Sequence, residues 1–224
     1  MKLIIRSFLL GLAGLLSGHS VVGQGKLSLS LSASPTFQYS KTEQTVLVPI
    51  TTNGQPVTAQ PVDFRAERTG WGYSVGLLAR YNLTARFSFS TGILLNRVRY
   101  NVPTISTNPA NVPFTLIATS QRNYQIPVTI NYLTSGKRLS PYVSAGGLFA
   151  LPSVTIFENG EKSKFPNQDI HIHPMLAAGL AYRLSNQLSV IAQPTFAYIL
   201  PQQSFSRYQN YQVGLQAQVL YTVR

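Results

Sequence analysis

Residues 26–40 alternate between apolar and polar side chains over their whole length. The odd positions from Leu27 to Tyr39 are apolar or aromatic, and the even positions from Ser28 to Ser40 are Ser, Thr or Gln. Because a β-strand sends successive side chains to opposite faces, this segment has one apolar face and one polar face. Strands in soluble globular proteins usually have about 5–6 residues. A two-faced strand of this length is typical of a wall between lipid and a polar lumen.

Seven further segments repeat the alternation, at 70–83, 86–96, 123–133, 141–151, 169–183, 188–199 and 210–224. Three of the connections between strands are short, and four are long, at 41–69, 97–122, 152–168 and 200–209. This layout predicts an all-β fold, an eight-stranded antiparallel up-and-down transmembrane β-barrel with long loops at one rim. Asn53-Gly54 and Asn159-Gly160 predict hairpins within the first and third long loops.

Aromatic residues fall at two levels of the predicted lipid-facing side. Trp71 and Tyr81 lie ten residues apart, which spans roughly 25 Å for a tilted strand, the height of the apolar band of such barrels. The expected aromatic girdle comprises Tyr39, Trp71, Tyr73, Tyr81, Phe87, Tyr132, Tyr182, Tyr198, Tyr211 and Tyr221.

The N-terminal residues resemble an export signal. Lys2 and Arg6 precede a short apolar run at 8–16, and small residues precede Gln24. This pattern predicts a signal peptide over 1–23 and a barrel domain over 24–224, and therefore export toward the bacterial outer membrane. The sequence contains no Cys, which excludes disulfides and thiolate metal sites.

Composition narrows the function classes further. Charged residues make up 11% of the chain, below the usual share in soluble domains of about 25%. No stretch after the leader approaches 18 apolar residues, which excludes a helical membrane protein. The net charge is +12, but the basic residues are scattered, so we expect no nucleic-acid partner.

Two adjacent segments resemble a known family. Residues 124–132 read Tyr-Gln-Ile-Pro-Val-Thr-Ile-Asn-Tyr, and 140–147 read Ser-Pro-Tyr-Val-Ser-Ala-Gly-Gly. This arrangement is similar to the PorT-like outer-membrane β-barrel family, whose members show a Tyr-x-x-Ile-Pro strand, a short turn and then Pro-Tyr-Val-x-x-Gly. The resemblance implies an integral outer-membrane protein of a Gram-negative bacterium without a defined biochemical activity.

His171 and His173 lie on the polar face of a predicted strand, with Asp169 two residues before them. Two His at this spacing, together with Asp169, are candidates for a metal site. The simpler interpretation is a pair of lumen histidines with hydrogen bonds to their neighbours. The predicted strands otherwise carry almost no carboxylate, so we expect neither a hydrolase triad nor any other enzyme, and no cofactor.

Five basic residues occupy polar positions of the alternation at the end of the barrel with the short turns: Lys26, Arg80, Arg86, Arg183 and Arg224. They form a candidate basic ring that attracts anions, or else a solvated rim whose charged heads stay in water.

The sequence therefore favours a structural or surface-interaction protein that uses its long loops and has no catalytic role. The expected partners are outer-membrane lipids, the barrel assembly machinery and an unknown extracellular or periplasmic molecule. Eight strands leave an interior just filled by side chains, so we do not expect a wide diffusion pore. The alternative from the transport class is therefore a narrow anion-preferring channel. A soluble lipocalin-like barrel is a further alternative, and it requires Trp71, Tyr73 and Leu77 to face inward.

Overall fold

The computed structural model describes residues 27–50, 58–108, 119–158, 161–166, 170–200 and 207–223. Eight strands form the barrel: β1 (Leu27–Ile50), β2 (Thr58–Asn82), β3 (Phe87–Tyr100), β5 (Thr119–Leu133), β6 (Leu139–Glu158), β8 (His171–Arg183), β9 (Leu188–Tyr198) and β10 (Arg207–Val223). Two short strands, β4 (Thr104–Asn108) and β7 (Glu161–Pro166), add to β2 and β6 outside this ring.

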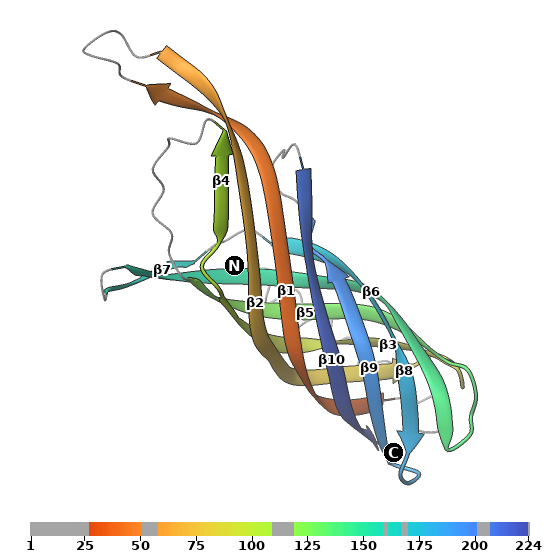
Figure 1. Cartoon of the computed structure of the whole chain (residues 1–224). Helices are drawn as coiled ribbons and strands as arrows, with labels where there is room; N and C mark the ends of the chain where they lie inside the picture. Colours follow the sequence, from red (N-terminus) through yellow and green to blue (C-terminus); the bar gives the residue numbers. More distant parts are fainter. Residues whose placement is uncertain are drawn as a thin grey trace.

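The barrel closes through β1 and β10. Each ring strand pairs antiparallel with the ring strands next to it in sequence, and β1 also pairs with β10 from Leu27↔Val223 to Glu43↔Arg207. The predicted eight-stranded up-and-down barrel is confirmed (Figure 1). No helix in the described part of the chain is long and apolar enough to cross a membrane.

Three tight turns join strands at one end of the barrel, hereafter the short-turn end. Two of them have the same construction. In the first, the backbone N–H groups of Arg86 and Phe87 donate to Thr84 Oγ1, and in the second those of Gln187 and Leu188 donate to Ser185 Oγ. A hydroxyl residue at the second turn position therefore fixes both reversals.

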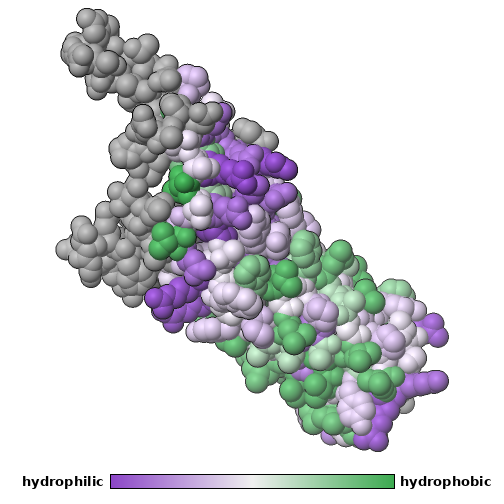
Figure 2. Space-filling view, viewed as in Figure 1, coloured by the Kyte–Doolittle hydropathy of each residue, from purple (hydrophilic) through white to green (hydrophobic). Residues whose placement is uncertain are grey.

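The outer surface carries the apolar side chains. Leu31 and Leu77 are cross-strand neighbours, exposed to 62% and 67%, and Trp71 is exposed to 65%. The intervening residues Ser32 and Ser74 are buried in the lumen. This facing is the reverse of a lipocalin, so the lipocalin-like alternative is wrong. On the face that Figure 2 shows, apolar side chains form a band across the barrel with hydrophilic surface on either side of it, as a transmembrane barrel requires.

The strands continue further at the long-loop end than the alternation predicted. β1 and β2 stay paired as far as Ile50↔Thr58, so the first long loop is largely an extended hairpin. β6 and β7 pair as far as Glu158↔Glu161, which confirms the hairpin expected in the third loop. The expected loop 97–122 contains the end of β3, all of β4 and the start of β5, because the alternation does not stop at Asn96.

Candidate functional site

The middle of the lumen is filled by side chains. Tyr142, Ile191 and Leu220 form a buried apolar cluster. Beside it, Arg80 Nη2 donates to Tyr142 Oη at 2.6 Å, and Tyr142 Oη donates to Asn131 Oδ1 at 2.7 Å. A cavity of about 20 Å³ remains at this level, room for about one water molecule.

A polar ladder continues the filling across three neighbouring strands. Gln193 Nε2 donates to Gln216 Oε1, and Gln216 Nε2 donates to Ser32 Oγ, both at 2.7 Å. All three residues are buried. These bonds satisfy both polar atoms of the Gln216 amide, whereas Gln193 Oε1 is buried without a hydrogen-bond partner among the described residues.

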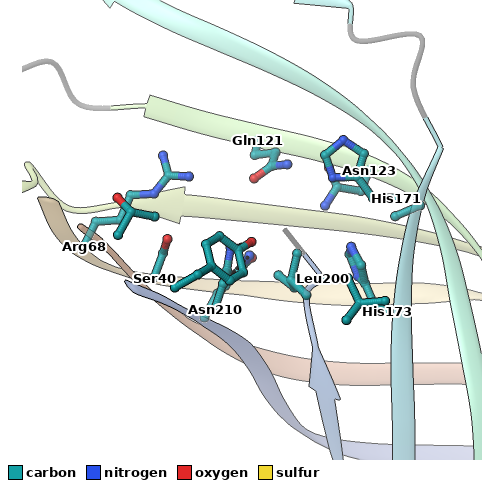
Figure 3. Close-up of a pocket in the computed structure, with 13 residues that line it drawn as sticks. Ser40, Arg68, Gln121, Asn123, His171, His173, Leu200 and Asn210 are labelled. Atoms are coloured by element: carbon teal, nitrogen blue, oxygen red, sulfur yellow. Dashed lines mark hydrogen bonds between the residues drawn. The ribbon is translucent and has the colours of Figure 1, made fainter. Parts of the chain in front are cut away.

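A larger cavity of about 260 Å³ lies above this filling, toward the long-loop end. Its walls come from strands around the ring (Figure 3) and include Ser40, Arg68, Gln121, Asn123, His171, His173, Tyr208 and Asn210. We call it the mouth cavity.

Hydrogen bonds fix part of the wall of the mouth cavity. Asn210 Nδ2 donates to Tyr208 Oη at 3.1 Å, and Gln38 Nε2 donates to Asn210 Oδ1 at 3.4 Å. The Arg68 guanidinium lies 4.4 Å from the ring centre of Tyr100, in cation–π geometry. Burial raises the pKa of the Tyr208 hydroxyl above its ordinary value.

The predicted histidine pair lines this cavity. The rings of His171 and His173 lie 6.3 Å apart, centre to centre. His173 is buried, and neither of its ring nitrogens has a hydrogen-bond partner among the described residues. Buried polar atoms of this kind are normally satisfied by water or a ligand, so the cavity suits polar contents.

The metal hypothesis stays a prediction. Asp169, its third candidate ligand, lies outside the described residues. Within the ranges that the structure describes, no group of three His, Cys, Asp or Glu side chains is placed to hold a metal ion.

The three described members of the candidate basic ring, Arg80, Arg86 and Arg183, are not gathered around one centre. Lys26 and Arg224 lie outside the described residues, and Arg86 and Arg183 are exposed at the short-turn end. Arg80 alone among the three described members points into the filled lumen, where its Nε donates to Ser90 Oγ at 3.3 Å.

The aromatic side chains of the predicted girdle meet at two levels. At the long-loop level, Trp71 lies 5.0 Å, centre to centre, from Phe37, a further aromatic residue beside the girdle, and Tyr39 stacks on Tyr211 at 5.2 Å. At the short-turn level, Phe87 and Tyr132 lie 4.9 Å apart. The other predicted members lie on the same outward phase: Tyr73, Tyr81, Tyr182, Tyr198 and Tyr221.

Sequence reasoning missed one group of charged residues. Arg97 and Arg99 on β3 and Arg122 on β5 are all exposed on the outer face of the barrel. They fall inside the segment expected to be a loop. The signal was present, since Arg97 and Arg99 continue the outward odd positions that begin at Phe87.

Comparisons with known proteins show similar architecture. No family model matches the chain, and no curated protein matches it. Neisserial surface protein A is 13% identical over 87% of this chain and 97% of its own, with a TM-score of 0.48. OprG of Pseudomonas aeruginosa is 8% identical over 90% and 99%, with a TM-score of 0.46. Ail of Yersinia pestis is 11% identical over 89% and 100%, with a TM-score of 0.43. These likenesses assign no function to the chain.

Proposed function

We propose that this chain is an integral protein of the bacterial outer membrane with a structural or surface-interaction role. The projecting β1–β2 hairpin carries this proposal. Pairing of β1 with β10 ends at Glu43, whereas pairing of β1 with β2 continues to Ile50. The hairpin therefore stands free of the ring, as Figure 1 shows at its upper left.

The base of the hairpin is polar, as expected outside lipid. The Arg65 guanidinium lies 3.5 Å from Glu43 and 4.0 Å from Glu67, and Lys41 Nζ lies 3.6 Å from Glu43. β4 lies beside β2 at this height, from Asp63↔Asn108 to Glu67↔Thr104. A three-stranded sheet thus supports the hairpin and offers a stiff platform to a partner molecule.

The filled lumen favours this role over transport. Tyr142, Ile191 and Leu220 are each exposed to 5% or less, and the cavity beside them is smaller than a hydrated ion needs. The narrow anion-preferring channel is the second candidate, and Arg80 favours it, because a cationic side chain at the constriction attracts anions.

Three finer proposals accompany this role. The chain is exported by a signal peptide over 1–23, inserted by the barrel assembly machinery, and related to the PorT-like family. The PorT-like motif supports the last of these, since its two segments lie on β5 and β6, which pair directly from Ile126↔Phe149 to Tyr132↔Val143.

Cysteine labelling tests the topology, because the natural chain contains no Cys. We expect Leu47→Cys, on the hairpin, to react with a membrane-impermeant maleimide on intact cells. Ser185→Cys, in a short turn, should react only after the outer membrane is permeabilised. The opposite pattern would place the hairpin in the periplasm and refute its surface role.

Trimming the hairpin tests the interaction role. Residues 46–62 can be replaced by Asn-Gly, because Thr45 and Asp63 face each other and Thr45 Oγ1 donates to Asp63 Oδ1 at 2.8 Å. The trimmed barrel should keep its altered gel migration before boiling, while adhesion and autoaggregation of producing cells fall. Undiminished adhesion with an intact barrel would reject the hairpin as the interacting element.

A further inference from the structure

Three arginines gather on the outer wall of the barrel near the long-loop end. Arg97 and Arg122 are directly opposite each other on β3 and β5, and Arg99 lies two residues further along β3. We call them the outer arginine cluster. Opposed residues of neighbouring strands have Cβ atoms about 4.5–5.5 Å apart, and alternate residues of one strand are roughly 6.6 Å apart. Their three guanidinium groups can therefore reach one anionic group.

The charge of this cluster is unbalanced within the described protein. Like charges directly opposite in a sheet are destabilising unless something neutralises them. The ion pairs among the described residues join Lys41 and Arg65 to Glu43 and Glu67, on the β1–β2 hairpin. Arg97, Arg99 and Arg122 have none of these partners, and each is exposed on the outer face. The cluster is thus suited to an anion supplied from outside the chain.

The cluster lies at the edge of the apolar belt. Arg99 is opposite Trp71 and Arg97 is opposite Tyr73, two members of the aromatic girdle. Directly below, toward the short-turn end, Leu95 faces Tyr124 on lipid-exposed wall. Ten residues separate Phe87 from Arg97, which for a strand tilted by about 40° is roughly 25 Å, the height of the apolar band. The guanidinium groups therefore stand where lipid headgroups begin.

We propose that the outer arginine cluster binds the phosphate of a phosphorylated lipid headgroup in the outer leaflet. Guanidinium groups bind phosphate oxygens through paired N–H donors, and three of them around one phosphate also remove the repulsion between Arg97 and Arg122. The lipid origin follows from position, because the neighbours on the same face are Trp71, Tyr73 and Tyr124, exposed to 65%, 46% and 58%. Such rings anchor at the membrane interface and offer acyl chains a surface. This inference rests on the proposed outer-membrane location.

The position of the single Trp of the chain provides a readout. Trp71 lies opposite Arg99, so its fluorescence should respond to a headgroup bound there. The refolded protein in detergent would be titrated with bisphosphorylated lipid A and, in parallel, with the same lipid freed of phosphate. We expect saturable binding of the phosphorylated lipid only, with the stoichiometry checked by native mass spectrometry.

Matched double variants test the residues. Arg97→Gln/Arg122→Gln should weaken binding of the phosphorylated lipid at least about tenfold, since two charge-assisted hydrogen-bonding groups are lost. Arg65→Gln/Arg207→Gln removes the same charge from the same end of the barrel and should leave the affinity within about twofold. Equal affinity of the natural protein and the Arg97/Arg122 variant, or equal binding of the two lipids, would overturn the proposal.

Inorganic phosphate distinguishes the source of the anion. We expect it to compete only weakly, because it lacks acyl chains to contact the aromatic rings. Displacement of the lipid by inorganic phosphate at similar concentration would define a soluble-anion site and reject the lipid assignment. Gel migration before and after boiling reports the barrel separately, so absence of lipid binding by the natural protein with an intact barrel contradicts this inference and leaves the proposed surface role standing.

Discussion

Arg80 on β2 and Tyr142 on β6 meet across the interior of the barrel, with Arg80 Nη2 2.6 Å from Tyr142 Oη. β2 and β6 are not neighbours in the ring, so this hydrogen bond spans the lumen. The Tyr142 hydroxyl in turn donates a hydrogen bond to Asn131 Oδ1, and Asn131 Nδ2 donates to Ser90 Oγ at 2.7 Å. One connected network therefore joins β2, β3, β5 and β6 across the lumen.

Removing the Tyr142 hydroxyl should destabilise the barrel. Tyr142→Phe keeps the ring in its apolar cluster but removes the acceptor of Arg80 Nη2 and the hydroxyl that donates to Asn131 Oδ1. Because a hydrogen bond to a charged group contributes about 1.5–3 kcal/mol, we expect the free energy of unfolding to fall by a similar amount. Urea unfolding in lipid vesicles measures it. Tyr221→Phe, on the outer face and 51% exposed, is the control and should change little.

The outward side chains of β1 and β2 predict that the loss of folding stability caused by a charged substitution depends on its depth in the membrane. Leu77 and Leu47 are both exposed to 67%, but Leu77 lies in the apolar belt and Leu47 on the projecting hairpin. Leu77→Arg should lower the free energy of unfolding by roughly 2–4 kcal/mol, and Leu47→Arg should lower it by about 0–1 kcal/mol. Refolding yield into vesicles and urea titration would measure both. Equal costs at the two sites would contradict the placement of the belt.

Adjacent glycines on β6 provide a test of backbone packing. A Cβ built on Gly146 would lie 2.0 Å from the Val128 carbonyl oxygen, whereas one on Gly147 would meet nothing closer than 3.8 Å. Gly146→Ala should therefore force β5 and β6 apart and lower stability by about 1–3 kcal/mol. Gly147→Ala should be near neutral. Thermal unfolding of both variants decides this, and similar melting temperatures would mean that β5 and β6 pack less closely than described.

The ring of eight strands was predictable because the alternation has a simple physical cause. Each strand separates lipid from a polar interior, so apolar and polar side chains alternate with a period of two at nearly every position. The Asn-Gly pairs also indicated that the first and third loops continue as hairpins. The short strand β4 was not predicted, because its residues Thr104–Asn108 form a strand only by pairing with the extended β2.

The interior was predicted less well than the wall. A polar lumen was expected, yet Leu78, Leu94, Leu148, Met175, Ile191 and Leu220 point inward and are buried. Where an apolar residue occupies an inward-facing position, the sequence does not indicate which other inward residues it contacts. Contacts across a barrel depend on the tilt and register of the strands. The alternation did place His171 and His173 on the inner face, but the walls that complete the mouth cavity come from distant strands.

The filled lumen predicts that the natural protein does not conduct ions steadily and that two substitutions open it. Tyr142→Ala and Leu220→Ala together remove most of the buried cluster around Ile191 and free the Arg80 side chain. Single-channel recording in planar bilayers should then show conductance that prefers anions, because the guanidinium lines the new path. Val143→Ala and Val219→Ala, the outward neighbours of these residues, form the matched control and should stay closed. Steady conductance of the unsubstituted barrel would instead favour the channel, and a cation preference in the opened variant would contradict the role of Arg80.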